Sequence, residues 1–183
     1  MSLFYPHIML HRVQQLSPEG LRRAGIRGIL LDVDNTLSPH GAPEPAPEAM
    51  EWIQKMKREG FLLCIVSTNT EERVAPFAGK LGLAFSAIAG KPLPFGFCRA
   101  TARLGLSRQQ VLAVGDQLFT DICGANLAGI RSALVEPIEP EHTLRFRLKR
   151  RLERPILRRF LQKYPERIAA GCFAAPESEV KKQ

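Results

Sequence analysis

Cysteine is scarce in this chain, and long apolar runs are absent. The four cysteines, at positions 64, 98, 123 and 172, form no CxxC pair, which argues against a disulfide framework and a thiolate zinc site. No apolar stretch approaches the ~20 residues that a membrane-spanning helix needs. Residues 1–16 lack the basic, apolar and small-residue segments of a secretory signal, so we expect a cytoplasmic protein.

Acidic residues are rare in one basic segment. Between positions 145 and 163, nine lysines and arginines stand against a single acid, Glu153. This excess of eight equals the formal net charge of +8, so the rest of the chain is neutral overall. The basic character therefore concerns the partners of this segment rather than the fold. We expect a domain over residues 1–140, beginning with an N-terminal packing arm, and a basic amphipathic extension over 141–183.

Short buried strands alternate with helices in the first 140 residues. Short apolar runs bounded by turn residues predict strands over 28–33, 61–66, 83–89, 111–114 and 131–135. Helical spacing and end signals predict helices over 48–59, 95–104 and 119–128, and another that begins near Glu71. This alternation predicts an α/β fold with a doubly wound parallel sheet.

Four of these strands end in reactive or charged residues. The carboxyl ends of parallel strands open on one edge of the sheet, so we expect these residues to lie together. Clustered carboxylates repel one another unless a hard cation binds, and oxygen ligands favour Mg²⁺. A lysine and a serine hydroxyl there would bind phosphate oxygens. The residues, in strand order, are Asp32 and Asp34; Ser67, Thr68 and Asn69; Lys91; Asp116 and Asp121.

Each signal alone has an ordinary structural explanation. Asp32 and Asp34 could belong to an Asx-rich turn, because Asp and Asn are common turn formers. Ser67 could be an ordinary cap of the helix that follows it, and Lys91 could be an ordinary solvated lysine. The ordered set favours a phosphate site more than any single motif does.

This ordered set resembles the four motifs of the haloacid dehalogenase (HAD) superfamily. Residues 32–37, Asp-Val-Asp-Asn-Thr-Leu, are similar to the DxDxT signature, and Ser67, Lys91 and the pair Asp116/Asp121 match the other motifs in order. Residues 67–69 and 115–121 further resemble the YqeG-type subclass IIIA phosphatases, relatives of phosphatidylglycerophosphatase. The resemblance covers residues 20–140, and it implies a HAD-like Rossmannoid fold.

The resemblance implies a Mg²⁺-dependent phosphatase that forms an aspartyl-phosphate. Asp32 would be the nucleophile, and Asp34 would protonate the leaving group and then activate water. The implied phosphate-binding residues are Ser67, Thr68, Asn69 and Lys91. The implied metal ligands are Asp32, Asp34 through its backbone carbonyl, Asp116 and Asp121.

The spacing of the motifs leaves no room for a separate cap domain. Asp32 and Ser67 are 35 positions apart, and Ser67 and Lys91 are 24 apart, enough for one helix and one strand each. A capless member of this superfamily suits a large substrate, and the family suggests phosphatidylglycerophosphate. The alternative is a phosphatase of soluble metabolites or nucleotides.

The basic segment Arg145–Lys163 has three interpretations. Its apolar residues form an amphipathic pattern, which we expect to be interrupted at Pro155. The segment could contact an anionic membrane at its inner face, where each basic residue contributes ~1 kcal/mol. It could instead pack on the sheet with its arginines solvated. It could also bind RNA, in which case the protein would be a basic RNA- or membrane-binding module with secondary phosphatase activity.

Overall fold

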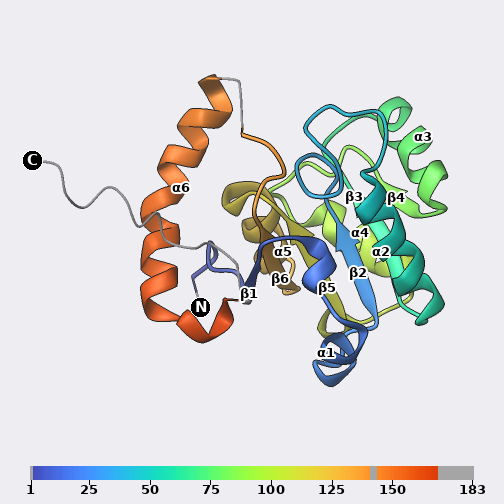
Figure 1. The fold of residues 1–183 in the computed structure, drawn as a ribbon, viewed down its shortest axis with the longest axis horizontal. Coiled ribbons are helices and arrows are strands. Elements are labelled where there is room, and N and C mark those ends of the chain that lie inside the picture. Colours follow the sequence, from blue (N-terminus) through green and yellow to red (C-terminus); the bar gives the residue numbers. More distant parts are fainter. Residues whose placement is uncertain (1, 141–143, 169–183) are drawn as a thin grey trace, which may run out of the picture.

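A six-stranded, all-parallel sheet in the order β1-β6-β5-β2-β3-β4 forms the centre of the fold (Figure 1). The computed structural model describes residues 2–140 and 144–168. The predicted doubly wound parallel sheet is confirmed, with no cap domain inserted between its strands. The strands are β1 (Ile8–Leu10), β2 (Gly28–Leu31), β3 (Leu62–Val66), β4 (Ala84–Ser86), β5 (Val111–Gly115) and β6 (Arg131–Val135).

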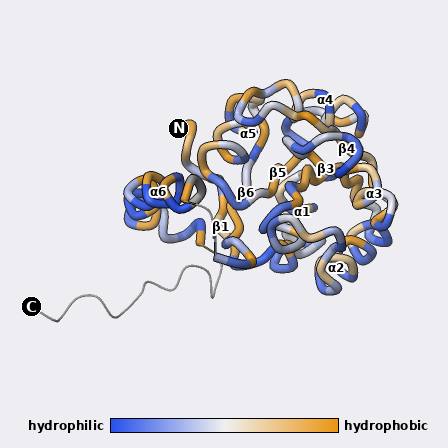
Figure 2. The backbone as a smooth tube through the Cα atoms, turned by 90° about the horizontal axis from the view of Figure 1, so that it is seen from above, coloured by the Kyte–Doolittle hydropathy of each residue, from blue (hydrophilic) through white to orange (hydrophobic). Residues whose placement is uncertain are grey.

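Helices cover both faces of this sheet (Figure 2). On one face, Leu21, Ile53 and Phe77 of the first three helices belong to one buried cluster with the inner strands. On the other face, Phe97 and Ala125 belong to a second cluster. The helices are α1 (Pro18–Arg23), α2 (Pro47–Arg58) and α3 (Glu71–Leu81) on the first face, and α4 (Phe95–Arg103) and α5 (Cys123–Leu127) on the second.

The N-terminal arm supplies a strand that the sequence did not indicate. β1 pairs with β6 in parallel, with Ile8 opposite Ala133. The strand is only three residues long, too short for an alternating pattern to be recognised. α1 begins directly after Ser17, whose hydroxyl accepts a hydrogen bond from the Gly20 N–H.

The basic segment forms one helix, α6 (Leu144–Lys163), which continues through Pro155. The expected interruption there is therefore wrong. Proline removes one helical hydrogen bond, but both sides of it are anchored to the body of the protein. Glu153 is buried on one side, and Phe160 is fully buried on the other. Tertiary packing therefore maintains the helix where local preference would end it.

α6 lies along the β1 edge of the sheet (Figure 1), and its apolar packing there comes from its second half. Phe160 lies among Met9, Leu118 and Leu134, whereas Leu144, Leu148 and Leu152 of the first half are exposed. None of the helices in the described ranges is both long and apolar enough to cross a membrane. The division of the chain at residue 140 remains a prediction, and residues 169–183 lie outside the described part.

Candidate active site

The carboxyl ends of β2, β3, β4 and β5 open on one edge of the sheet, into a pocket of about 680 Å³. β2 lies between β5 and β3, which places Asp32 between the ends of the strands that lead to Asp116 and Ser67. Asp116 is fully buried and does not line this pocket. The predicted residues that line the pocket itself are Asp32, Asp34, Ser67, Thr68, Asn69, Lys91 and Asp121.

Lys91 bridges two carboxylates in the middle of this pocket. Its ammonium donates to Asp32 Oδ1 at 2.6 Å and to Asp121 Oδ1 at 2.7 Å, and only 3% of its side chain is exposed. Burial alone would lower the pKa of Lys91, but Asp121 and Asp32 raise it above its ordinary value. Burial raises the pKa of Asp32 to about 7, although Lys91 opposes this shift. The site thus holds a permanent cation beside a carboxyl that titrates near neutrality.

Asp34 is positioned by groups from three separate segments. Its Oδ2 accepts from Asn69 Nδ2 at 2.9 Å, and its Oδ1 accepts from the Gly41 N–H at 2.8 Å. Arg73 of α3 lies 3.3 Å from Oδ1. Ser67 Oγ in turn accepts the Asn69 N–H at 3.2 Å, so it also fixes this corner of the pocket. The proline-rich loop 38–47, which contains Gly41, and α3 therefore act together as the rim around Asp34.

Asp121 lies on a π-helical turn, Leu118–Ile122, where an ordinary helix was predicted from residue 119. The wider turn brings the Asp121 carboxylate back over the end of β5. A Cβ atom on Gly115 would lie only 2.4 Å from Asp121 Cγ, so only glycine fits there. Asp121 Oδ2 also accepts the Gln117 N–H at 3.1 Å. Such π-turns are frequent at functional sites.

Three carboxylates converge as a metal site requires. Oxygen atoms of Asp32, Asp116 and Asp121 all lie within 4.8 Å of one another. Asp116 Oδ1 is buried and has no hydrogen-bond partner among the described residues. Burial raises the pKa of Asp116 well above its ordinary value, since this carboxylate lacks the solvation that would stabilise its charge. The donor set and the unpartnered oxygen fit a hard divalent cation.

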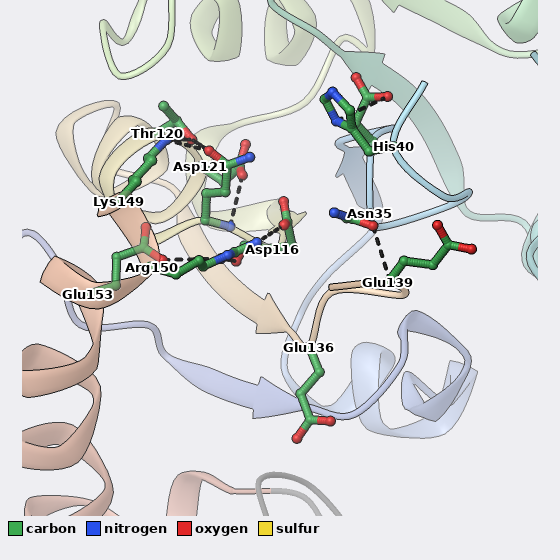
Figure 3. A network of polar contacts seen from close by, with 12 residues as sticks. Asn35, His40, Asp116, Thr120, Asp121, Glu136, Glu139, Lys149, Arg150 and Glu153 are labelled. Carbon is green, nitrogen blue, oxygen red and sulfur yellow. Dashed lines mark hydrogen bonds and ion pairs between the residues drawn. The ribbon is translucent and has the colours of Figure 1, made fainter. Parts of the chain in front are cut away.

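Residues of α6 also reach this site, and the sequence reasoning missed them (Figure 3). Arg150 donates to the Asp116 carboxylate and backbone carbonyl, and also to Glu153 Oε2 at 3.1 Å. Lys149 lines the pocket next to Thr120. The one available signal was Glu153, the single acid of the basic segment, which is buried and accepts the Phe119 N–H at 3.3 Å.

Comparison with known proteins agrees with this geometry. Residues 40–129 match the haloacid dehalogenase-like hydrolases. The chain is 35% identical over 156 residues to the probable phosphatase YqeG of Bacillus subtilis (strain 168), covering 85% of this chain and 91% of that protein. It is 26% identical over 169 residues to phosphatidylglycerophosphate phosphatase 1 (chloroplastic/mitochondrial) of Arabidopsis thaliana. That alignment covers 86% of this chain but 48% of the plant protein, so the chain spans about half of its length.

A solved structure shows the same fold. The cobalt-bound deoxy-D-mannose-octulosonate 8-phosphate phosphatase of Haemophilus influenzae superposes with a TM-score of 0.50 at 13% identity. The superposition covers 60% of this chain and 68% of that one. At this identity the likeness concerns the fold alone, and it agrees with the parallel sheet described above.

Proposed function

This chain belongs to the haloacid dehalogenase-like hydrolases and is a phosphatase, and on that basis we propose that it releases phosphate from a membrane lipid, phosphatidylglycerophosphate. Asp32 is the proposed nucleophile and Mg²⁺ the proposed cofactor. The observation that carries the chemistry is the ion pair of Asp32 with Lys91 in an uncapped pocket. A nucleophilic carboxylate next to a permanent cation is the arrangement that phosphoryl transfer to an aspartate requires.

Each residue has a part in two successive displacements. An Asp32 oxygen bonds to phosphorus as the bond from phosphorus to the leaving oxygen breaks. Asp34 gives its proton to that oxygen, then takes a proton from the water that hydrolyses the aspartyl-phosphate. Lys91 and Ser67 bind the phosphoryl oxygens, and Thr68 and Asn69 border them. Mg²⁺, when bound, would stabilise the charge of these oxygens, and its ligands would be Asp32, the Asp34 carbonyl, Asp116 and Asp121.

The open pocket supports a large substrate. Between Asp32 and Ser67 the chain holds only a loop, α2 and β3, and between Ser67 and Lys91 only α3 and β4. Nothing inserted at these points covers the site. A relative that is named a phosphatidylglycerophosphate phosphatase supports a lipid in particular.

The first half of α6 supports contact with an anionic membrane. Leu144, Leu148 and Leu152 are 80%, 58% and 57% exposed, and their spacing of four places them on one side of the helix. Exposed arginines, among them Arg147 and Arg151, lie beside them. Apolar residues flanked by cations fit an interface of acyl chains and anionic headgroups.

The RNA interpretation has less support. Base stacking would need exposed aromatic side chains near the arginines. Phe160 is buried, however, and Tyr164 packs against Tyr5 and Phe160 at ring-centroid distances of 6.0 and 5.5 Å. These rings are therefore part of the packing between α6 and the N-terminal arm.

Phosphate release from vesicles tests the proposal. Vesicles that contain phosphatidylglycerophosphate would be compared with soluble glycerol 3-phosphate, each with Mg²⁺ or with EDTA. We expect Mg²⁺-dependent release that is faster from the vesicles, and its loss in Asp32→Asn with an unchanged circular dichroism spectrum. Equal or faster turnover of glycerol 3-phosphate would favour the soluble-metabolite alternative. Unchanged turnover in Asp32→Asn would show that Asp32 is not the nucleophile.

A further inference from the structure

Lys149 is a second lysine in the active-site pocket, and neither the HAD-type motifs nor the mechanism above uses it. It comes from α6, and it lines the same pocket as Asp32, Asp34 and Lys91. Its ammonium donates to the side-chain oxygens of Gln117 and Thr120, the latter at 3.4 Å. Figure 3 shows Lys149 pointing toward Thr120, on the side of the site opposite His40.

The surroundings of Lys149 differ from those of the other cations at the site. Lys91 and Arg150 each pair directly with two carboxylates, whereas Lys149 forms no ion pair with a carboxylate of the described residues. Burial lowers the pKa of Lys149, and the more distant Asp121 only partly offsets this effect. Removing an ammonium from water without an anionic partner costs free energy, which a bound anion would offset.

The acceptors of this ammonium are neutral. Among residues 2–140 and 144–168 they are two side-chain oxygens, and neither carries a negative charge. The transferred phosphoryl group already has Lys91 and Ser67 at the centre of the pocket. A further cation, held beside Gln117 and Thr120, is thus available for a different part of the substrate.

We propose that Lys149 binds a second anionic group of the substrate, a phosphodiester carried by the leaving alcohol. This inference rests on the proposed function and assigns the residue that would recognise the phosphodiester of its substrate. The enzyme would select monoesters whose alcohol bears a phosphodiester, and simple sugar or glycerol phosphates would lack the group that Lys149 recognises. Lys149 is then a specificity-determining residue rather than a catalytic one.

Two soluble substrates with the same phosphorylated glycerol isolate this contact. Glycerol 3-phosphate lacks a second anion, whereas deacylated phosphatidylglycerophosphate has a phosphodiester and a second glycerol. We expect the native enzyme to prefer the deacylated compound. Lys149→Gln should lower kcat/KM for that compound by about 10- to 100-fold, the range for a hydrogen bond to a charged group, mostly through KM. The value for glycerol 3-phosphate should change by less than about threefold.

Lys163→Gln is the matched control. It removes the same charge from the last turn of the same helix, where Lys163 Nζ lies 5.4 Å from the centre of the Tyr164 ring. Both kcat/KM values should be unchanged in this variant. An equal loss for both substrates in Lys149→Gln would instead assign Lys149 to the transferred phosphoryl group, and no change would mean that Lys149 only stabilises the turn at Thr120. Either outcome overturns the proposal.

Binding to catalytically inactive protein separates this proposal from the proposed function. The dissociation constants of both compounds would be measured by calorimetry on Asp32→Asn and on Asp32→Asn/Lys149→Gln, with Mg²⁺ present. We expect the second substitution to weaken the binding of the deacylated compound and to leave the binding of glycerol 3-phosphate unchanged. If the native enzyme released no phosphate while this difference persisted, the phosphatase proposal would fail and the subsite would remain. If neither protein distinguished the two compounds, the subsite would be wrong.

Discussion

Arg150 pairs with Asp116, the fully buried acid at the end of β5, although the two residues are 34 positions apart. The guanidinium also contacts the Asp116 carbonyl and Glu153. It leaves Asp116 Oδ1 without a hydrogen-bond partner in the described structure, and Asp116 belongs to the acidic cluster. The helix with the chain's excess charge thus holds a proposed metal ligand in position.

Arg150→Gln should destabilise the metal-free protein by about 3–5 kcal/mol, because removing one partner of a buried ion pair leaves the other charge uncompensated. Urea unfolding in EDTA measures this loss. Arg147→Gln removes an exposed arginine of the same helix and should change stability by less than about 0.5 kcal/mol. Equal effects of the two substitutions would show that the contact with Asp116 contributes nothing to stability.

Asp34→Asn should lower kcat/KM, which reports the first displacement alone, by about 10²–10⁴-fold on alkyl phosphates, since an amide cannot protonate the leaving alkoxide. The loss measured with p-nitrophenyl phosphate should be much smaller, because nitrophenolate leaves without a proton. The ratio of the two losses, from steady-state kinetics, tests the proton transfer. Asn69→Ala, which removes a donor to Asp34, should show the same preference with a smaller loss, because it only loosens the position of the acid. Equal losses on both substrates in Asp34→Asn would exclude a general acid at this position.

Mg²⁺ should stabilise the protein more at pH 8 than at pH 5.5. Burial raises the pKa of Asp32 from 3.8 to about 7, so the folded metal-free protein keeps a proton there that the unfolded chain releases. This proton stabilises the fold fully below pH 3.8, and its contribution disappears as the pH rises through about 7. Mg²⁺ must displace the proton, so its affinity rises across the same interval.

The shift in Tm between EDTA and MgCl₂ at the two pH values measures this competition. Asp32→Asn has no proton to displace at this position, so its Mg²⁺-dependent shift should vary less with pH. A shift in the native protein that is the same at both pH values would contradict the raised pKa.

Local sequence was sufficient for the residues that directly follow buried strands. Asp32 directly follows the last residue of β2, and Ser67 directly follows the last residue of β3. The parallel sheet then brings those two strand ends together. Arg150 and Lys149 could not be identified in this way. They are two of nine basic residues with similar neighbours, and their positions depend on how α6 packs through Phe160. That packing is a tertiary effect, as is the continuation of α6 through Pro155.

Replacing Leu144, Leu148 and Leu152 together with serine should weaken binding to anionic vesicles by at least about tenfold. Burying even half of a leucine side chain is worth about 1 kcal/mol, and these three side chains are more than half exposed in the structure. Deleting α6 would be a poorer test, because it would also remove Phe160 from the core and Arg150 from Asp116.

Vesicle co-sedimentation measures this binding, and turnover of glycerol 3-phosphate shows whether the active site is intact. Soluble turnover should stay within about twofold of the native rate, because these leucines lie outside the catalytic pocket. Leu127→Ser changes a leucine of α5 that is 45% exposed, and it should leave both measurements unchanged. If the triple variant still bound vesicles like the native protein, the first half of α6 would not be the membrane contact. Lower soluble turnover in that variant would instead mean that the substitutions had displaced Arg150 from Asp116.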